Sequence, residues 1–316
     1  MPDNIIIKTM ADLPAQRHSN PATAAQKRAR YFNSGNAFMV KLPPVPNMVF
    51  IEEPLRALSD ASPTGLIPCD ASSQMDCPFP ATSPLVLAYY ARICKNEELK
   101  TEFIASGTIV YVIKGMGTTK SGKETIHWGE GDIFIIPGGD YQLHRAHGET
   151  VVLWIVTNEP QLAFENLNAP DKGQAPTKLV HYPSDEINRQ FNLMYDAGQN
   201  DEIAGSALIF SSDKQEKSRN ALPTLTVAMN SLPPKAVQKA HKHNSAAIAL
   251  VIQGESCFSM IDGERKDWAP WATTITPPVS VHSHHNVGYE MARFLIVQDG
   301  GIFSHVRAMG FEFIDE

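Results

Sequence analysis

Two stretches near the C-terminus decide the fold: His241–Gly254 reads HKHNSAAIALVIQG, and Trp271–His284 reads WATTITPPVSVHSH. Each contains a short run of β-branched or apolar residues, and Gly or Pro stands nearby, which is typical of a strand. His241 and His243 stand at i and i+2, as do His282 and His284. Because alternate residues of a strand share a face, each pair presents both imidazoles on one side of a sheet.

Both stretches have an earlier counterpart in the chain. Glu102–Gly115 (EFIASGTIVYVIKG) aligns without gaps with the first stretch at an offset of 139 residues. Gly131–His144 (GDIFIIPGGDYQLH) aligns with the second at an offset of 140. Two motifs that keep nearly the same offset indicate an internal repeat, so we expect two copies of one β-domain.

The remaining patterns fit an all-β chain with short helical additions. Further strand-like apolar runs lie at 151–156 and 294–297. Helices are expected at Ala22–Phe32 and Ser184–Ala197, because polar capping residues and Gly or Asn stand at their ends. We therefore expect an N-terminal extension over 1–90, a first β-domain over 91–160, a linker with a helix over 161–200 and a second β-domain over 201–316.

Composition excludes several classes of protein. The 316 residues are 43% hydrophobic, too apolar for a disordered chain, and no run approaches the 18 apolar residues of a membrane span. The net charge of −7 argues against a nucleic-acid partner. The four cysteines form no CxxC pair and the N-terminus does not resemble a signal peptide, so we expect a cytoplasmic protein without a membrane partner.

Three histidines of the second copy are candidate metal ligands. Brought together across neighbouring strands, His241, His243 and His282 would form a facial site for Fe(II), Mn(II), Ni(II), Cu(II) or Zn(II). In the ungapped alignment, the first copy has other residues at the ligand positions, and its second motif ends with a histidine that corresponds to His284. A metal site is therefore not expected in the first copy. The residues at its ligand positions are Glu102, Ile104, Thr108 and Gln142.

The chain resembles the two-domain members of the cupin family. Their pattern is G-x5-HxH-x3,4-E-x6-G followed by G-x5-PxG-x2-H-x3-N, and the second copy matches it at His241, His243, Gly254, Pro277, His282 and Asn286. Its departures are Lys235, Trp271 and Val279 in place of glycines, and Ala247 in place of the ligand Glu. The resemblance implies two cupin barrels of the double-stranded β-helix, or jelly-roll, type, with the metal site kept in the C-terminal barrel and lost in the N-terminal one.

Loss of the Glu makes the site similar to that of a subset of cupins, the gentisate and salicylate 1,2-dioxygenases. Three neutral ligands leave a metal its positive charge and open positions, which suits an anionic bidentate substrate together with O2. The resemblance thus implies a non-haem Fe(II) dioxygenase that opens the ring of a hydroxylated aromatic. In the gentisate and salicylate group the metal usually lies in the N-terminal barrel. Here the ligands lie in the C-terminal barrel, which is more similar to the arrangement in the large subunit of the two-component hydroquinone 1,2-dioxygenases. A homo-oligomer is expected, and the need for a second subunit is left open.

Other residues are candidates for the chemistry around the metal. His284 shares the face of His282 and would be the acid/base, or else a buried, hydrogen-bonded histidine. Asn244 and Gln253 would orient the substrate. Arg293 would pair with a substrate carboxylate, or form a salt bridge at the barrel rim. Trp271 would stack on the ring, or pack in its hairpin.

Two other functions are compatible with the same histidines. A three-His cupin centre would also suit cleavage of a small β-diketone or oxidation of a thiol. A non-catalytic bicupin that binds a metal or a ligand is the alternative outside enzymes.

Overall fold

The computed structural model describes residues 7–197 and 206–314, which belong to two units, Met1–Pro43 and Pro44–Glu316. The first unit holds the short helices η1 (Met10–Asp12) and α1 (Ala24–Arg28). Thr23 caps α1 by accepting a hydrogen bond from the backbone N–H of Gln26. The helix predicted over 22–32 is shorter than expected, because the backbone is already extended at Ala29.

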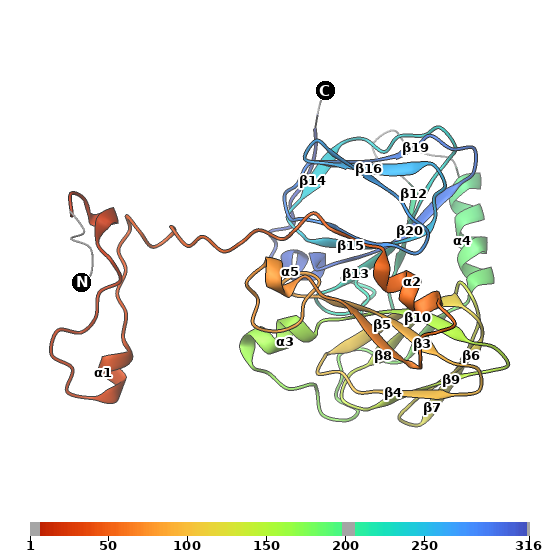
Figure 1. Ribbon diagram of the computed structural model, residues 1–316, viewed down its shortest axis with the longest axis horizontal. Helices are drawn as coiled ribbons and strands as arrows, with labels where there is room; N and C mark the ends of the chain where they lie inside the picture. The colour runs from red at the N-terminus through yellow and green to blue at the C-terminus, as the bar shows by residue number, and fades with distance from the viewer. Residues whose placement is uncertain (1–6, 198–205, 315–316) are drawn as a thin grey trace. The chain divides into compact units, whose positions relative to one another are not determined.

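The second unit contains two barrels, each built from two antiparallel sheets, so the predicted all-β fold of two barrels with short helices is confirmed (Figure 1). In the N-terminal barrel a six-stranded sheet has the order β11-β8-β5-β10-β3-β2, and a four-stranded sheet the order β4-β9-β6-β7. Their strands are β2 (Gly65–Cys69), β3 (Leu87–Ile93), β4 (Glu98–Thr101), β5 (Gly107–Lys114), β6 (Gly117–Ser121), β7 (Glu124–Trp128), β8 (Ile133–Pro137), β9 (Gln142–Ala146), β10 (Val151–Thr157) and β11 (Val180–Tyr182).

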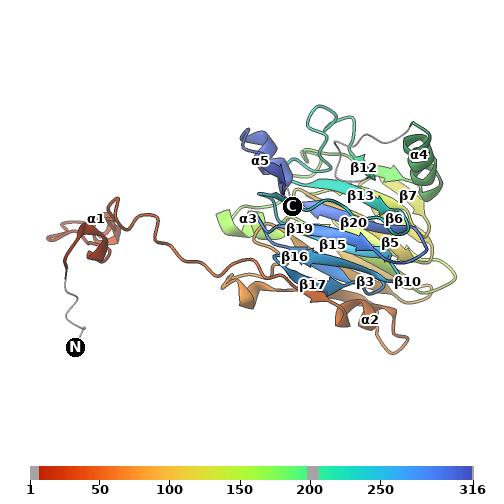
Figure 2. The ribbon, with the colours of Figure 1, turned by 90° about the horizontal axis from the view of Figure 1, so that it is seen from above.

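The C-terminal barrel repeats this arrangement with a six-stranded sheet, β1-β18-β15-β20-β13-β12, and a five-stranded sheet, β17-β16-β19-β14-β21. Figure 2 shows the strands of the large sheets running side by side. The strands are β1 (Val49–Phe50), β12 (Ser206–Phe210), β13 (Thr226–Leu232), β14 (His241–His243), β15 (Ala247–Gln253), β16 (Cys257–Ile261), β17 (Glu264–Asp267), β18 (Thr273–Thr276), β19 (His282–Asn286), β20 (Ala292–Gln298) and β21 (Phe311–Phe313).

Short helices join the strands of this unit. They are α2 (Glu52–Leu58), η2 (Ser72–Gln74), α3 (Glu159–Glu165), α4 (Ser184–Asp196) and α5 (Gly300–His305). Helix α4 lies where the sequence predicts a helix over 184–197. None of the helices in the described ranges is both long and apolar enough to cross a membrane.

The segment 1–90, expected to precede the barrels, contributes strands to both. Val49–Phe50 pairs with β18 at the edge of the C-terminal six-stranded sheet, and Gly65–Cys69 pairs with β3 at the edge of the N-terminal one. These strands cover edges whose backbone groups would otherwise lack partners. Where the domains divide remains a prediction.

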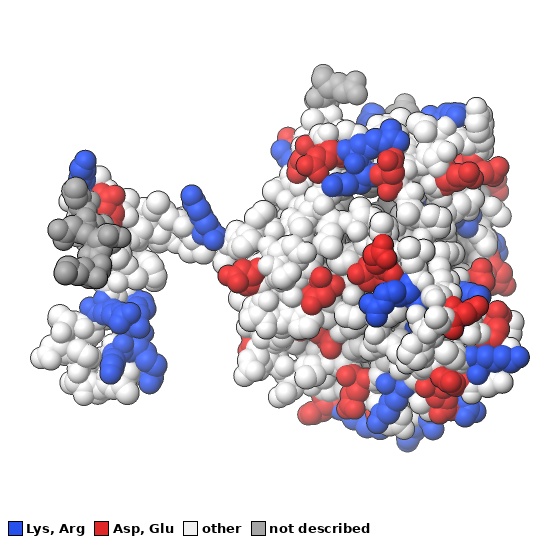
Figure 3. All heavy atoms as spheres, viewed as in Figure 1, with Lys and Arg blue, Asp and Glu red and all other residues white. Residues whose placement is uncertain are grey.

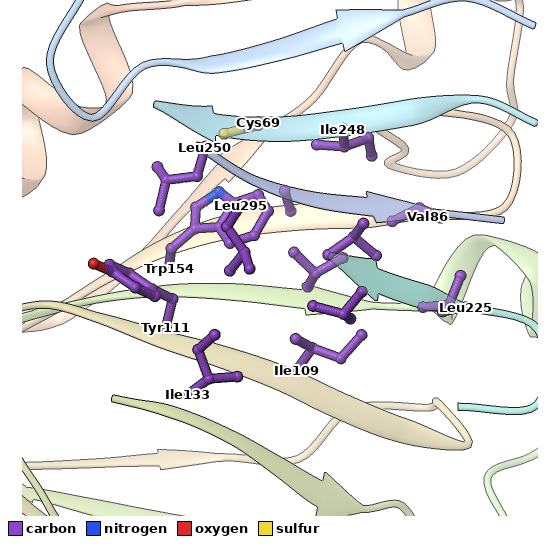
Figure 4. Packing of buried hydrophobic residues seen from close by; sticks show 14 of the residues in the cluster. Cys69, Val86, Ile109, Tyr111, Ile133, Trp154, Leu225, Ile248, Leu250 and Leu295 are labelled. Carbon is purple, nitrogen blue, oxygen red and sulfur yellow. The ribbon is translucent and has the colours of Figure 1, made fainter. Parts of the chain in front are cut away.

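The two six-stranded sheets pack face to face around one buried core (Figure 4). Trp154 lies in this core and donates a hydrogen bond from Nε1 to Oγ1 of Thr273 in the other barrel, over 2.9 Å. Its strand neighbours Leu153 and Ile155 face the opposite way, into the interior of the N-terminal barrel. Because both faces of β10 are buried, its sequence is a continuous apolar run rather than an alternating one.

Candidate metal centre

Three imidazoles meet inside the C-terminal barrel. His241 and His243 come from β14, and His282 comes from the neighbouring strand β19, directly opposite His241. One nitrogen of each ring lies within 4.8 Å of those of the other two, and all three residues are buried. Within residues 7–197 and 206–314, this is the group of His, Cys, Asp or Glu side chains whose geometry suits a metal ion.

The backbone fixes the orientation of each imidazole. Nδ1 of His241 lies 2.8 Å from the carbonyl oxygen of Lys239, and Nδ1 of His282 lies 2.9 Å from that of Ser280. His243 makes the same contact with Ser245 over 2.9 Å. A carbonyl only accepts, so each Nδ1 carries the proton and each Nε2 keeps its lone pair. Such bonds to the second nitrogen are the usual way of orienting a histidine ligand.

The environment keeps the three histidines neutral. Burial lowers the pKa of His241 and of His243 against the opposing effect of their carbonyl partners. Burial, reinforced by His241, lowers the pKa of His282 to about 3. At neutral pH all three rings are therefore unprotonated at Nε2, the state that binds a metal.

The position of the missing carboxylate is flanked by a glutamine that the sequence analysis missed. Ala247 pairs directly with Gln298 of β20. Nε2 of Gln298 lies 3.2 Å from Nε2 of His243. No local sequence signal points to this residue, because the strand pairing that brings it to His243 joins segments about fifty residues apart.

The positions that lack the cupin glycines keep a glycine-like backbone. Lys235, Trp271 and Val279 have φ of 62°, 61° and 58°, in the left-handed region. Gly131 and Gly139 take the same region in the N-terminal barrel, at φ of 86° and 87°. The turn geometry is thus preserved although a side chain now has to be accommodated there.

His284 lies on the face of its strand that the sequence predicts, beside the three imidazoles. Its ring centroid is 5.8 Å from that of His282. The hydroxyl of Ser259 lies 2.8 Å from its Nδ1 and also accepts a hydrogen bond from Trp268 Nε1 over 2.8 Å. Burial and the neighbouring imidazoles hold its pKa well below the usual range. An acid/base role for His284 remains a prediction.

The N-terminal barrel repeats this hydrogen-bonded group. The hydroxyl of Thr119 lies 2.8 Å from Nδ1 of His144 and accepts from Trp128 Nε1 over 2.8 Å. The group therefore exists in a barrel that lacks the three-His cluster.

The N-terminal barrel also corrects the ungapped alignment. Thr101 pairs with Gln142 as His241 pairs with His282, so Thr101, not Glu102, is equivalent to His241. Glu102 and Ile104 point outward and are exposed, whereas Phe103 is buried.

The cause of the misalignment is the length of one loop. Thr108, seven residues after Thr101, occupies the sheet position that Ala247 occupies six residues after His241. The loop before β5 is thus one residue longer than its counterpart, which an alignment without gaps cannot reveal.

Two of the predicted substrate-binding residues lie on the opposite face of the large sheet from the site. Arg293 is on the face of β20 that carries Leu295, and it donates a hydrogen bond to Oδ1 of Asn188 in α4 over 2.7 Å. Trp271 packs against the core between the barrels, with its ring centroid 6.3 Å from that of Tyr111. The expectation that these two line the metal site is therefore wrong.

The hydrogen bonds of Asn244 and the position of Gln253 lie outside the histidine cluster. Both amide atoms of Asn244 bind the backbone of the C-terminal segment, at Ala308 O over 2.6 Å and at Gly310 N over 3.1 Å. Gln253 is exposed at the far end of β15, six residues and roughly 20 Å along the strand from Ala247. The predicted role of both in orienting a substrate lacks support in this geometry.

Comparison with known proteins agrees with the fold and the cluster. Residues 229–298 match the cupin domain. This match lies within the C-terminal barrel and includes the three histidines, and the resemblance to cupin dioxygenases is supported.

Two curated relatives each match less than a third of the chain. A gentisate 1,2-dioxygenase of Streptomyces sp is 32% identical over 93 residues, which are 29% of this chain and 26% of the relative. A 1-hydroxy-2-naphthoate 1,2-dioxygenase of Nocardioides sp. (strain KP7) is 30% identical over 90 residues, 28% of this chain and 23% of the relative. The matched stretch thus spans about a quarter of each relative.

Solved structures show the same fold over most of the chain. The salicylate 1,2-dioxygenase of Pseudaminobacter salicylatoxidans superposes with a TM-score of 0.73 at 13% identity, over 88% of this chain and 91% of that one. Its adduct with gentisate gives a TM-score of 0.72 at 11% identity, over 88% of this chain and 87% of that one. Both matches extend over the two barrels.

The surface in Figure 3 bears on the expected partners. On the face of residues 44–316 in view, Lys and Arg are interspersed with Asp and Glu. The net charge of the chain is −7. That nucleic acid is not a partner remains a prediction.

Proposed function

We propose that this chain is a non-haem Fe(II) dioxygenase that opens the ring of a hydroxylated aromatic of the gentisate, salicylate or hydroquinone type with O2. The cluster of His241, His243 and His282 carries the proposal, because three oriented neutral imidazoles form a ligand set that leaves positions open for substrate. The names of the two curated relatives support an aromatic substrate.

The residues of the cluster fit a divalent first-row metal. Imidazole nitrogen is a good ligand for iron, zinc, copper and nickel, and each Nε2 is unprotonated because each Nδ1 holds the proton. His241, His243 and His282 would hold the ion. Bound iron would supply a Lewis acid for the substrate oxygens and a redox link between the ring and O2.

The surrounding side chains determine which substrates the site would favour. Ala247 contributes no negative charge, so the positive charge of a bound ion stays available to an anionic substrate. Phe311 of β21 stacks on His241, with ring centroids 5.2 Å apart, and gives one side of the cluster an aromatic wall. An anionic aromatic compound matches both features.

Oxygen uptake by iron-loaded protein tests this function. Protein purified without air and loaded with Fe(II) should consume O2 on addition of gentisate, salicylate or hydroquinone. His282→Ala should lose both the iron and the uptake. His285→Ala is the matched control: it lies on the same strand but stacks on Phe258, with ring centroids 4.5 Å apart, and it should retain both.

Other outcomes would contradict the proposal. Uptake with small β-diketones or thiols alone would assign the same centre to a different oxidation. Iron binding without uptake on any of these compounds would indicate a non-catalytic metal-binding bicupin.

The cellular location and the oligomeric state of the protein are also proposals. We infer a cytoplasmic homo-oligomer that acts on a small aromatic, and a second subunit is the alternative. Light scattering of the purified chain distinguishes a homo-oligomer from a monomer that would need a second subunit to assemble.

A further inference from the structure

We propose that Gln298 takes the place of the missing carboxylate and sets the charge of the metal site. The inference rests on the proposed metal binding by the three histidines. Because the Gln298 amide is uncharged, the site would bind the metal less tightly, and an anionic substrate more tightly, than it would with a carboxylate at this position.

The first observation is the position of Gln298 in the sheet. It faces Ala247 across the β15–β20 ladder, and Ala247 is where the cupin pattern has its ligand Glu. Directly opposite residues of a ladder have Cβ atoms about 5 Å apart, so a long side chain at 298 reaches the space that a long side chain at 247 would fill. Ala247 is too short to fill that space itself.

The second observation is the contact with a ligand atom. Nε2 of Gln298 lies 3.2 Å from Nε2 of His243, whose Nδ1 proton is already committed to the Ser245 carbonyl. The amide therefore donates into the lone pair that a metal would use. Gln298 holds His243 in its ligand orientation while no ion occupies that lone pair, and it has to release the ring when an ion does.

The third observation concerns the amide oxygen. No described residue donates a hydrogen bond to Oε1 of Gln298, and a Cβ added to Gly300 would lie 3.8 Å from it. A rotation of the amide by half a turn exchanges its oxygen and nitrogen. Once Nε2 of His243 binds a metal, this rotation would present an oxygen, a suitable partner for a cation or for a hydroxyl group of the substrate.

The N-terminal barrel supports a role specific to the site. The residue equivalent to Gln298 is Thr157, which pairs with Thr108 as Gln298 pairs with Ala247. Its hydroxyl is bonded to Glu159, over 2.9 Å. The barrel without the histidine cluster therefore has a short side chain there, turned to another partner.

Gln298→Glu tests the proposal, because it changes one amide to a carboxylate of the same size. The measurements use the full chain: Co(II) binding followed by its visible absorption, then gentisate binding to the Co(II) protein. The carboxylate should tighten Co(II) binding by about tenfold or more, since it lies near a divalent cation in a buried site. It should weaken gentisate binding by about tenfold or more, since it offsets the positive charge that attracts the anion.

The controls separate this inference from the function it rests on. Gln253→Glu makes the same change at the exposed end of β15 and should alter neither affinity. If Gln298→Glu does not fold, Ala247→Glu places the charge on the facing residue and should give the same two shifts. Unchanged affinities in the folded variant, with Co(II) bound normally by the unmodified chain, would overturn the role of Gln298 alone. Failure of the unmodified chain to bind Co(II) would instead overturn the proposed metal site.

Discussion

His144 should make the protein sensitive to acid. Its side chain is fully buried in the N-terminal barrel, and burial lowers its pKa from 6.5 to about 4. The unfolded chain therefore binds a proton at this residue at a higher pH than the folded chain does. Stability is lost as the pH falls below 6.5, and the loss continues until the pH reaches the folded-state value.

The magnitude follows from the two pKa values. Between pH 7 and pH 5, the free energy of unfolding should fall by about 2 kcal/mol through this one residue. His144→Gln removes the titrating group, so urea unfolding of both proteins at both pH values isolates its contribution. At pH 7 the variant is the less stable protein, since it loses the bond to Thr119. From pH 7 to pH 5 the variant should gain about 2 kcal/mol relative to the unmodified protein, and a difference that does not change with pH would contradict the inferred titration of His144.

Three further substitutions test the packing around the barrels. Asn244→Ala removes the bonds to Ala308 and Gly310, so it should cost about 1 kcal/mol and speed proteolysis after residue 305, and unchanged cleavage would contradict the anchoring role. Val279→Gly relieves the left-handed φ of 58° and should raise the unfolding free energy by about 0.5 to 1 kcal/mol in urea, whereas a loss would mean that the turn is unstrained. Gly107→Ala places a Cβ 2.6 Å from Leu222, so it should lower the free energy of unfolding by about 1 to 3 kcal/mol. An unchanged melting temperature would show that the Leu222 side chain moves aside at no cost.

The sequence is sufficient to predict the strands and the three-His cluster. Runs such as 151–156 are apolar throughout because the strand is buried on both faces, and this signal is local. His241 and His243 face one side because a strand alternates, and His282 joins them because its strand pairs with theirs. The internal repeat makes this pairing predictable from the sequence.

The wrong predictions have one cause: the alternation of residues along a strand does not show which of two buried faces of the sheet a residue lies on. Each six-stranded sheet has one face toward a barrel interior and one toward the core between barrels, and both faces are lined by apolar residues. Nothing local therefore shows that Arg293 faces away from the site while Phe294 faces the barrel interior. Gln298 was missed for the related reason that its contact with His243 depends on the register of β15 against β20. The one-residue difference in loop length before β5 likewise leaves no mark in a gapless alignment.

Diffraction from crystals soaked in Fe(II) or Co(II), recorded at the absorption edge of the metal, would locate a bound ion. We expect an anomalous peak in the C-terminal barrel, about 2.0 to 2.2 Å from Nε2 of His241, His243 and His282. No peak is expected at the equivalent position beside Thr101 and Gln142 in the N-terminal barrel. A crystal that takes up the metal elsewhere while the three imidazoles stay empty would contradict the proposed metal site.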